Sequence, residues 1–127
     1  MIAAQLAELL GAKQVSVNAD ILAAYRFDRW CLKHWQDWRG EALDAPACVV
    51  RPRDSAEVQA VVRFAAEHNV AIVPWGLGSG VCGGIEPQPD QILIDMSAMN
   101  RVLSIDEENL LLTVEAGING LVAEEAV

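Results

Sequence analysis

Apolar residues near the start of the chain recur at helical spacing, which predicts a helix over residues 2–12. Its apolar face consists of Ile2, Leu6, Leu9 and Leu10. A short extended piece is expected at Lys13–Val17, and Asn18 or Asp20 can cap a second helix that runs through Tyr25. We therefore expect residues 1–45 to form an N-terminal helical extension.

A strand–helix–strand pattern begins at Ala47. Ala47–Val50 and Val70–Val73 are short apolar runs that contain β-branched valine and are typical of buried strands. Between them, Asp54 stands three residues before Glu57, a spacing typical of a capping box at a helix start. The apolar face of this helix is expected to consist of Val58, Val61, Val62, Ala65 and Ala66. The short connections predict a βαβ unit with parallel strands.

Further strands and a final helix complete the pattern. Strands are predicted at Ile92–Ile94, which ends at Asp95, at Val102–Ile105 and at Leu110–Val114, and a helix starts at Leu121. The order of elements predicts an α+β fold with a βαβ unit, a small parallel sheet and additional strands.

The segment Trp75–Gly84 follows a predicted strand and contains five glycines in ten residues. Glycine tolerates positive φ, and without a Cβ it lets backbone N–H groups crowd around an anion. Ser79 adds a hydroxyl donor. This glycine-rich loop therefore suits a phosphate or pyrophosphate group.

Two common phosphate-binding motifs do not describe this loop. No lysine follows the glycines, so the loop is not a Walker A motif. Gly78–Gly83 matches GxGxxG, but the turn-forming stretch Gly83–Pro89 follows it, and no acidic residue stands near Met99, where a Rossmann fingerprint requires one. Composition alone also allows a flexible surface loop without a ligand.

Composition narrows the classes of ligand and partner. The net charge is −9 and the nine basic residues are scattered, so nucleic acid is not expected as a partner. No apolar run reaches the ~18 residues that a transmembrane segment needs, and the opening residues resemble an amphipathic helix more than a secretory signal. Three cysteines and two histidines form no zinc pattern, so no metal site is expected and a cytoplasmic protein with free thiols is favoured.

Three of the four tryptophans lie close together in the sequence, at Trp30, Trp35 and Trp38. Aromatic side chains at this density either form the wall of a ligand site or pack against a core, and the second interpretation is favoured. Glu41–Pro46 is then a connector to the next strand.

Four blocks of sequence, in order, resemble one flavoprotein family. They are VVRPRDSAEVQAVVRFAAEHNVAIVPWG, the glycine-rich loop, ILIDMSAMNRVLSID and LTVEAGINGLVAEEAV. Residues 46–127 are similar to the first part of the FAD-binding domain in the FAD-linked oxidase/transferase (type 4) family of the vanillyl-alcohol oxidase/p-cresol methylhydroxylase (PCMH) superfamily. The resemblance implies a truncated PCMH-type half-domain, with the C-terminal half of the FAD domain and the cap domain as missing partners.

The resemblance also implies which residues bind the cofactor. The glycine-rich loop wraps the FAD pyrophosphate in this family, through positions that match Pro74, Trp75, Gly76, Leu77, Gly78, Ser79, Gly80, Val81, Gly83 and Gly84. A later segment that matches Glu115, Ala116 and Gly117 lies close to the cofactor in the family, although for Glu115 the favoured interpretation is an ordinary charge at a strand end.

Three positions set expectations about how FAD is held. Many members have arginine at the position of Trp75 and glycine at that of Leu77, so the Leu77 side chain must point away from the phosphates. Members that tether flavin from this loop use histidine where Ser79 stands, so non-covalent FAD is expected.

Three alternatives for function are open, and the resemblance implies the first two. The first is an FAD-dependent oxidoreductase that acts on a D-2-hydroxy acid of the lactate or glycolate type, with flavin N5 accepting hydride. The second is a flavin transferase of the alkylglycerone-phosphate synthase type, with a lipid-like substrate. The third is a truncated, non-catalytic fragment with weak or no FAD binding. The catalytic residues of the family are expected beyond Val127, so none is named, and the chain alone is expected to be inactive.

Overall fold

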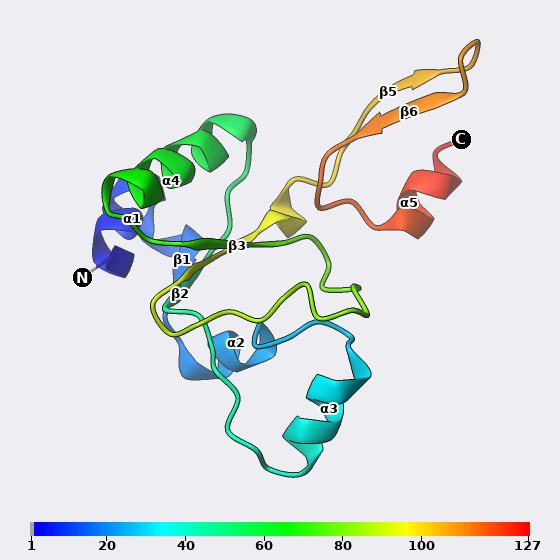
Figure 1. Cartoon of the computed structure of the whole chain (residues 1–127). Coiled ribbons are helices and arrows are strands. Elements are labelled where there is room, and N and C mark those ends of the chain that lie inside the picture. The colour runs from blue at the N-terminus through cyan, green and yellow to red at the C-terminus, as the bar shows by residue number, and fades with distance from the viewer. Residues whose placement is uncertain (1) are drawn as a thin grey trace.

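The computed structural model describes residues 2–127 as an α+β fold built on a four-stranded sheet (Figure 1). The strands, in spatial order, are β1 (Val15–Ser16), β2 (Cys48–Val50), β4 (Ile92–Asp95) and β3 (Ile72–Trp75). Strands β2, β4 and β3 are parallel, and β1 is antiparallel to β2. A separate antiparallel hairpin consists of β5 (Val102–Asp106) and β6 (Leu111–Val114). The predicted class, a small parallel sheet with additional strands, is therefore confirmed.

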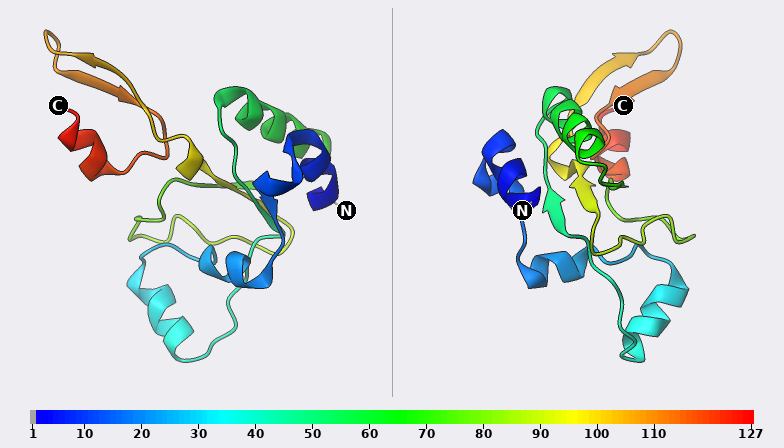
Figure 2. Two further views of the ribbon diagram at one scale, coloured as in Figure 1. Left: turned by 180° about the vertical axis from the view of Figure 1, so that it is seen from behind. Right: turned by 60° about the vertical axis from the view of Figure 1, so that its left-hand side comes forward.

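Four of the five α-helices in residues 2–127 form two groups on opposite sides of the sheet, and the fifth, α5 (Gly120–Glu125), lies beside the β5–β6 hairpin. The other four are α1 (Ile2–Leu10), α2 (Ala19–Ala24), α3 (Cys31–Trp38) and α4 (Ser55–Glu67), with short 3₁₀ helices η1 (Ala12–Gln14) and η2 (Met96–Ala98). Helices α1 and α4 lie on one side and α2 and α3 on the other, while the β5–β6 hairpin projects away from the sheet (Figure 2). Within residues 2–127, no helix has the length and apolar character needed to span a bilayer.

The predicted βαβ unit is present as β2–α4–β3, with one difference in the order of its strands. The two strands do not pair with each other, because β4 lies between them and pairs with both. All four residues of β4 are buried. A central parallel strand is covered on both faces, which explains why Ile92–Asp95 is an uninterrupted apolar run up to its last residue.

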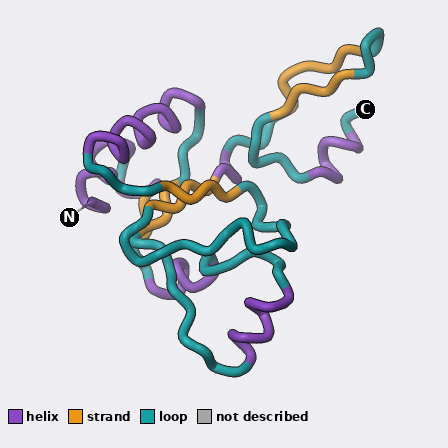
Figure 3. The backbone as a smooth tube through the Cα atoms, viewed as in Figure 1, coloured by secondary structure: helices purple, strands orange, loops and turns teal. Residues whose placement is uncertain are grey.

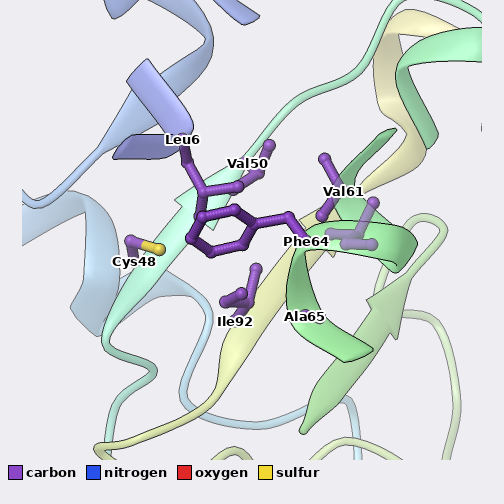
Figure 4. Close-up of a cluster of buried hydrophobic side chains, with 8 residues drawn as sticks. Leu6, Cys48, Val50, Val61, Phe64, Ala65 and Ile92 are labelled. Carbon is purple, nitrogen blue, oxygen red and sulfur yellow. The ribbon is translucent and has the colours of Figure 1, made fainter. Parts of the chain in front are cut away.

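The main core lies between the sheet and the helices α1 and α4 (Figure 4). Successive side chains of a strand point to opposite faces, so alternate residues of β2 and β4 reach this core. Its buried members are Leu6, Cys48, Val50, Val61, Phe64, Ala65, Ile92 and Ile94. Burial raises the pKa of the Cys48 thiol to about 11, so this cysteine is an uncharged packing residue at neutral pH.

Helix α4 begins where its sequence predicts but buries a different face. The Asp54 side chain accepts a hydrogen bond from the Glu57 amide at 2.9 Å, which confirms the predicted cap. The expected apolar face included Val62, which is 48% exposed. The buried stripe instead runs through Val61 and Ala65 and includes Phe64, whose ring fills the space between α4 and the sheet.

The first 45 residues contribute to the same sheet and core as the rest of the chain. Strand β1 pairs with β2, with Val15 opposite Val50. Leu6 of α1 is fully buried in the main core. The predicted domain boundary at residue 46 stays a prediction. The pairing of β1 with β2 and the burial of Leu6 join the residues on its two sides.

Helix α3 lies outside the main core, so the favoured interpretation of the tryptophan cluster is wrong for two of its members. Trp35 is 50% and Trp38 is 82% exposed, and α3 has no buried residue. Trp35 is covered in part by the Arg39 guanidinium, 4.5 Å above its ring. The aromatic density of this segment carried no information about which of its side chains has a partner.

Three side chains meet at the carboxyl end of the parallel sheet. Asp95, the last residue of β4, accepts hydrogen bonds from Arg51 Nε at 2.7 Å and from the Tyr25 hydroxyl at 2.8 Å. Burial by itself raises the pKa of the Asp95 carboxyl. The hydrogen bonds that it accepts, including one from the Ser97 amide at 2.9 Å, outweigh burial, so its pKa lies below the usual value. The cluster ties the segment after α2 to the ends of β2 and β4.

A substitution in α1 tests whether this helix is part of the core. Leu6→Ala is expected to lower the free energy of unfolding by about 2–5 kcal/mol, because it removes a fully buried side chain and leaves a cavity. Leu9→Ala, at a position 49% exposed in the same helix, is the matched control and is expected to cost less than about 0.5 kcal/mol. Urea denaturation measures both. Equal effects of the two substitutions would contradict a core role for α1.

Asp95 predicts a pH dependence of stability. Its pKa is lower in the folded chain than in the unfolded chain, so its contribution is present above about pH 4 and is lost as the pH falls through the folded value. Asp95→Asn is therefore expected to be less stable than wild type at pH 7, by about 1–3 kcal/mol. This difference is expected to shrink below about pH 4. Urea denaturation from pH 7 to pH 3 measures it, with Asp90→Asn at an exposed position as the control. A difference that stays constant over this range refutes the prediction.

Candidate functional site

The glycine-rich loop begins at the carboxyl end of β3, the same edge of the sheet at which β2 and β4 end. Figure 3 shows the connection between β3 and β4 as a continuous stretch without helix or strand. In α/β sheets, the crevice outside the carboxyl ends of parallel strands is the usual place for a ligand. The predicted anion site is therefore located where the topology favours one.

The loop presents backbone donors that the rest of the chain does not use. Among residues 2–127, no hydrogen bond is donated by the amides from Leu77 to Gly83. Ser79 and Val81 are exposed, so their amides and the Ser79 hydroxyl lie near the surface. A run of unused N–H groups is the arrangement that binds a phosphate or pyrophosphate oxygen.

Two glycines of the loop adopt backbone conformations that other residues rarely take. Gly78 has φ of 63° and Gly83 has φ of 75°. Each also lies against an aromatic ring: a Cβ on Gly78 would overlap the Trp75 ring, and a Cβ on Gly83 would lie 2.5 Å from the Trp30 ring. Glycine is needed at both positions for its positive φ and for the close approach of a ring.

The far half of the loop is bound to the segment that joins α2 and α3. The amide of Arg29 donates to the Gly80 carbonyl oxygen at 2.8 Å, and the Gly84 amide donates to Asp28 Oδ2 at 3.1 Å. Sequence reasoning missed Asp28. The available signal was an acidic residue placed between Phe27 and Trp30, in a segment otherwise treated only as an aromatic cluster.

The second predicted segment lies beside the start of the loop. A Cβ on Gly76 would lie 3.5 Å from the Ala116 carbonyl oxygen. Gly117 is buried against η2, and a Cβ there would overlap the Met96 carbonyl group. The structure thus brings together the two stretches that the sequence assigned to one site, and the absence of a Cβ permits the close approach of Gly117 to Met96.

Glu115 makes an ion pair instead of presenting a free carboxylate. The Arg101 guanidinium donates to Glu115 Oε2 at 3.1 Å and to Oε1 at 2.6 Å, and the Arg101 amide donates to Oε2 at 2.8 Å. These contacts lower the pKa of the Glu115 carboxyl. Glu115 joins the start of β5 to the end of β6, and its proximity to a flavin stays a prediction.

Leu77 lines a hollow of about 360 Å³ between the loop and the α2–α3 segment. Other lining residues include Arg26, Phe27, Arg29, His34 and Trp75. Leu77 is 44% exposed and lies next to the segment between α2 and α3. The required orientation away from a phosphate group stays a prediction.

The residues present fit the pyrophosphate of FAD. Ser79, Gly80 and Val81 are exposed, while Gly78 is buried against the Trp75 ring, and the amides from Leu77 to Gly83 are unused within residues 2–127. These are neutral donors, which bind an anion without a lysine or arginine. No group of three or more metal-ligating side chains is found among the residues that the structure describes. Pro74 and Trp75, the first predicted contacts, belong to β3 and position the start of the loop.

Comparisons with known proteins identify the family. Residues 46–127, most of the chain, match the family described as FAD binding domain. The glycolate oxidase subunit GlcD of Bacillus subtilis (strain 168) is 40% identical over 73 residues, which are 58% of this chain and 16% of that protein.

Two solved structures share the fold. A structure of an alkyldihydroxyacetonephosphate synthase superposes with a TM-score of 0.87 at 27% identity, over 98% of this chain and 24% of that chain. A structure of p-cresol methylhydroxylase with substrate bound superposes with a TM-score of 0.72 at 27% identity, over 92% of this chain and 22% of that chain.

The present chain thus spans about a sixth to a quarter of the length of these proteins. Its sequence blocks and its fold agree with the predicted PCMH-type FAD-binding domain. The chain belongs to the FAD-linked oxidase/transferase family of the vanillyl-alcohol oxidase/p-cresol methylhydroxylase superfamily, and its cofactor is FAD.

Proposed function

We propose that this chain supplies the pyrophosphate-binding loop of an FAD-dependent oxidoreductase. The observation that carries the proposal is the run of unused amides from Leu77 to Gly83 at the carboxyl end of the sheet. The neighbouring Ser79 hydroxyl adds a donor, and Ala116 beside Gly76 extends the site toward β6. FAD is held without a covalent bond from this loop, because Ser79 stands where tethering relatives have histidine.

The substrate that we propose is a D-2-hydroxy acid of the lactate or glycolate type. The similarity to a glycolate oxidase subunit supports this class. When bound, FAD supplies a hydride acceptor at its N5 atom. The residues of this chain bind and orient the cofactor through its pyrophosphate. The substrate site and the acid–base groups are contributed by further parts of the protein, namely the second half of the FAD domain and a cap domain.

A flavin transferase is the second candidate. Its support is the superposition on an alkyldihydroxyacetonephosphate synthase over 98% of the chain, which includes the N-terminal helices. In that case the substrate is lipid-like and the overall reaction involves no net oxidation. A non-catalytic fragment that binds FAD weakly or not at all is the third candidate.

A cytoplasmic location is also part of the proposal. Cys31, Cys48 and Cys82 carry free thiols, and Cys31 and Cys82 are exposed. Exposed free thiols persist in a reducing compartment.

Ligand competition tests the role of the glycine-rich loop. If its amides bind the pyrophosphate, then ADP and inorganic pyrophosphate are expected to displace FAD from the chain, whereas riboflavin, which has no phosphate, is not. Ser79→Ala is expected to weaken FAD binding by up to about tenfold, because it removes one hydroxyl donor. Flavin fluorescence in a titration measures both effects.

The control is Ser104→Ala, which removes an exposed hydroxyl from β5, outside the loop. It is expected to leave FAD affinity unchanged. Displacement by riboflavin but not by ADP would show that the chain recognises the isoalloxazine instead of the phosphates, and the proposed role of the loop would be wrong.

The substrate class is tested on a protein that contains this chain together with the rest of the FAD domain and the cap. Reduction of a redox dye driven by D-lactate or glycolate is expected. Exchange of a fatty alcohol into an acyl-dihydroxyacetone phosphate, without dye reduction, would instead establish the transferase. The 127-residue chain with added FAD and D-lactate is expected to show no turnover, and turnover by it would contradict the assignment of catalytic groups to other parts of the protein.

A further inference from the structure

The Asp28 carboxylate is buried and both of its oxygens accept hydrogen bonds from backbone amides. The side chain is 3% exposed. Oδ1 accepts from the Trp30 amide at 2.9 Å, and Oδ2 accepts from the Gly84 amide at 3.1 Å. Within residues 2–127 it forms no salt bridge. A buried charge is costly unless it is paired or hydrogen-bonded, so these two amides are what stabilise the carboxylate.

Gly80 is the second point of contact between this segment and the loop. Its carbonyl oxygen accepts the Arg29 amide at 2.8 Å. A Cβ on Gly80 would lie 2.8 Å from Asp28 Oδ2, closer than a carbon and an oxygen normally approach. The backbone of the loop thus lies directly against the Asp28 carboxylate.

Trp30 provides the third contact, because its ring lies against Gly83. Gly83 is followed by Gly84, whose amide donates to Asp28. Residues 28–30 therefore hold the loop at positions 80, 83 and 84, while the Trp75 ring lies against Gly78. The amides from Leu77 to Gly83 donate no hydrogen bond within the described chain. This support uses the amide of Gly84, one of the predicted FAD contacts, but not the amides from Leu77 to Gly83 that are proposed to bind the anion.

We propose that Asp28 is a positioning residue for the FAD site: it fixes the conformation of the glycine-rich loop before the cofactor binds, and thereby sets the affinity for FAD. A loop with five glycines in ten residues has a large conformational entropy when free. If the loop is already ordered, the binding of FAD does not have to order it, and affinity rises accordingly. The inference rests on the proposed role of the loop in binding the FAD pyrophosphate.

The experiment uses the 127-residue chain and three substitutions of aspartate. Asp28→Ala removes both acceptors, and Asp28→Asn keeps one acceptor oxygen. Asp44→Ala, on the exposed connector before β2, is the matched control. The first readout is hydrogen exchange of the Gly84 and Arg29 amides by NMR without FAD. The second is the Kd for FAD from flavin fluorescence.

Asp28→Ala is expected to accelerate exchange at Gly84 and to raise the Kd for FAD by about tenfold or more, because a hydrogen bond to a buried charge is lost. Asp28→Asn is expected to lie between Asp28→Ala and wild type in both readouts. Asp44→Ala is expected to match wild type. A purely structural role for Asp28 would lower stability without this graded change in FAD affinity.

Gly80→Ala tests the same contact from the loop. When Asp28 is present, the added Cβ of Gly80→Ala would lie too close to Asp28 Oδ2. The loop is therefore expected to be displaced and the Kd for FAD to rise. In the Asp28→Ala background the obstructing carboxylate is gone, so the additional effect of Gly80→Ala is expected to be smaller. Additive effects of the two substitutions would overturn the proposal, because residues in contact are expected to be coupled.

The remaining outcomes also decide between the alternatives. Unchanged Gly84 exchange and unchanged FAD affinity in Asp28→Ala would overturn the inference. If the 127-residue chain alone binds no FAD, the Kd is measured on a protein that also contains the rest of the FAD domain, and absence of binding there overturns the proposed role of the loop. The exchange rates in the free chain test separately whether Asp28 orders the loop. If Asp28→Ala does not fold, the graded comparison uses Asp28→Asn and Gly80→Ala, and wild-type behaviour of both would overturn the inference.

Discussion

A loop made largely of glycine has few side chains with which to hold its own conformation, and this constraint explains the arrangement around it. Ordering glycine costs more backbone entropy than ordering any other residue, so the contacts that fix such a loop must come from other segments. Here they come from the segment between α2 and α3, through the Asp28 carboxylate, the Arg29 amide and the Trp30 ring. An N-terminal segment that precedes the matched family region thus supports the loop that we propose as the pyrophosphate-binding site.

The position of that segment depends in turn on the carboxyl end of the sheet. Asp95 ends β4 and binds both Arg51 and Tyr25, and the Tyr25 ring meets the Trp75 ring edge-on at 4.8 Å between centroids. Trp75 is the last residue of β3 and lies against Gly78. The sheet therefore sets the place of the N-terminal segment and of the loop through one connected group of side chains.

Periodicity and turn chemistry predicted most strands and helices of this fold with small errors at their ends, and the glycine spacing predicted a loop that the structure places at the carboxyl end of the sheet. Three features were not predictable in this way. The insertion of β4 between β2 and β3 is set by long-range pairing, which a strand pattern does not encode. The exposure of Trp38 depends on whether a partner element covers α3. The role of Asp28 depends on contacts 52 and 56 residues away along the chain, at Gly80 and Gly84.

The absence of a Cβ at the glycines of the loop has two separate consequences. The absence of a Cβ lets an anion approach the backbone amides, as the sequence suggested. It also lets the Trp75 ring, the Trp30 ring and the Asp28 carboxylate approach the backbone from the protein side. Leu77 has a side chain, but it lines the hollow beside the segment between α2 and α3. Its amide remains unused within residues 2–127. A loop whose backbone contacts both a ligand and a supporting segment has little room for side chains of its own. The contacts that support it therefore come from a distant part of the chain.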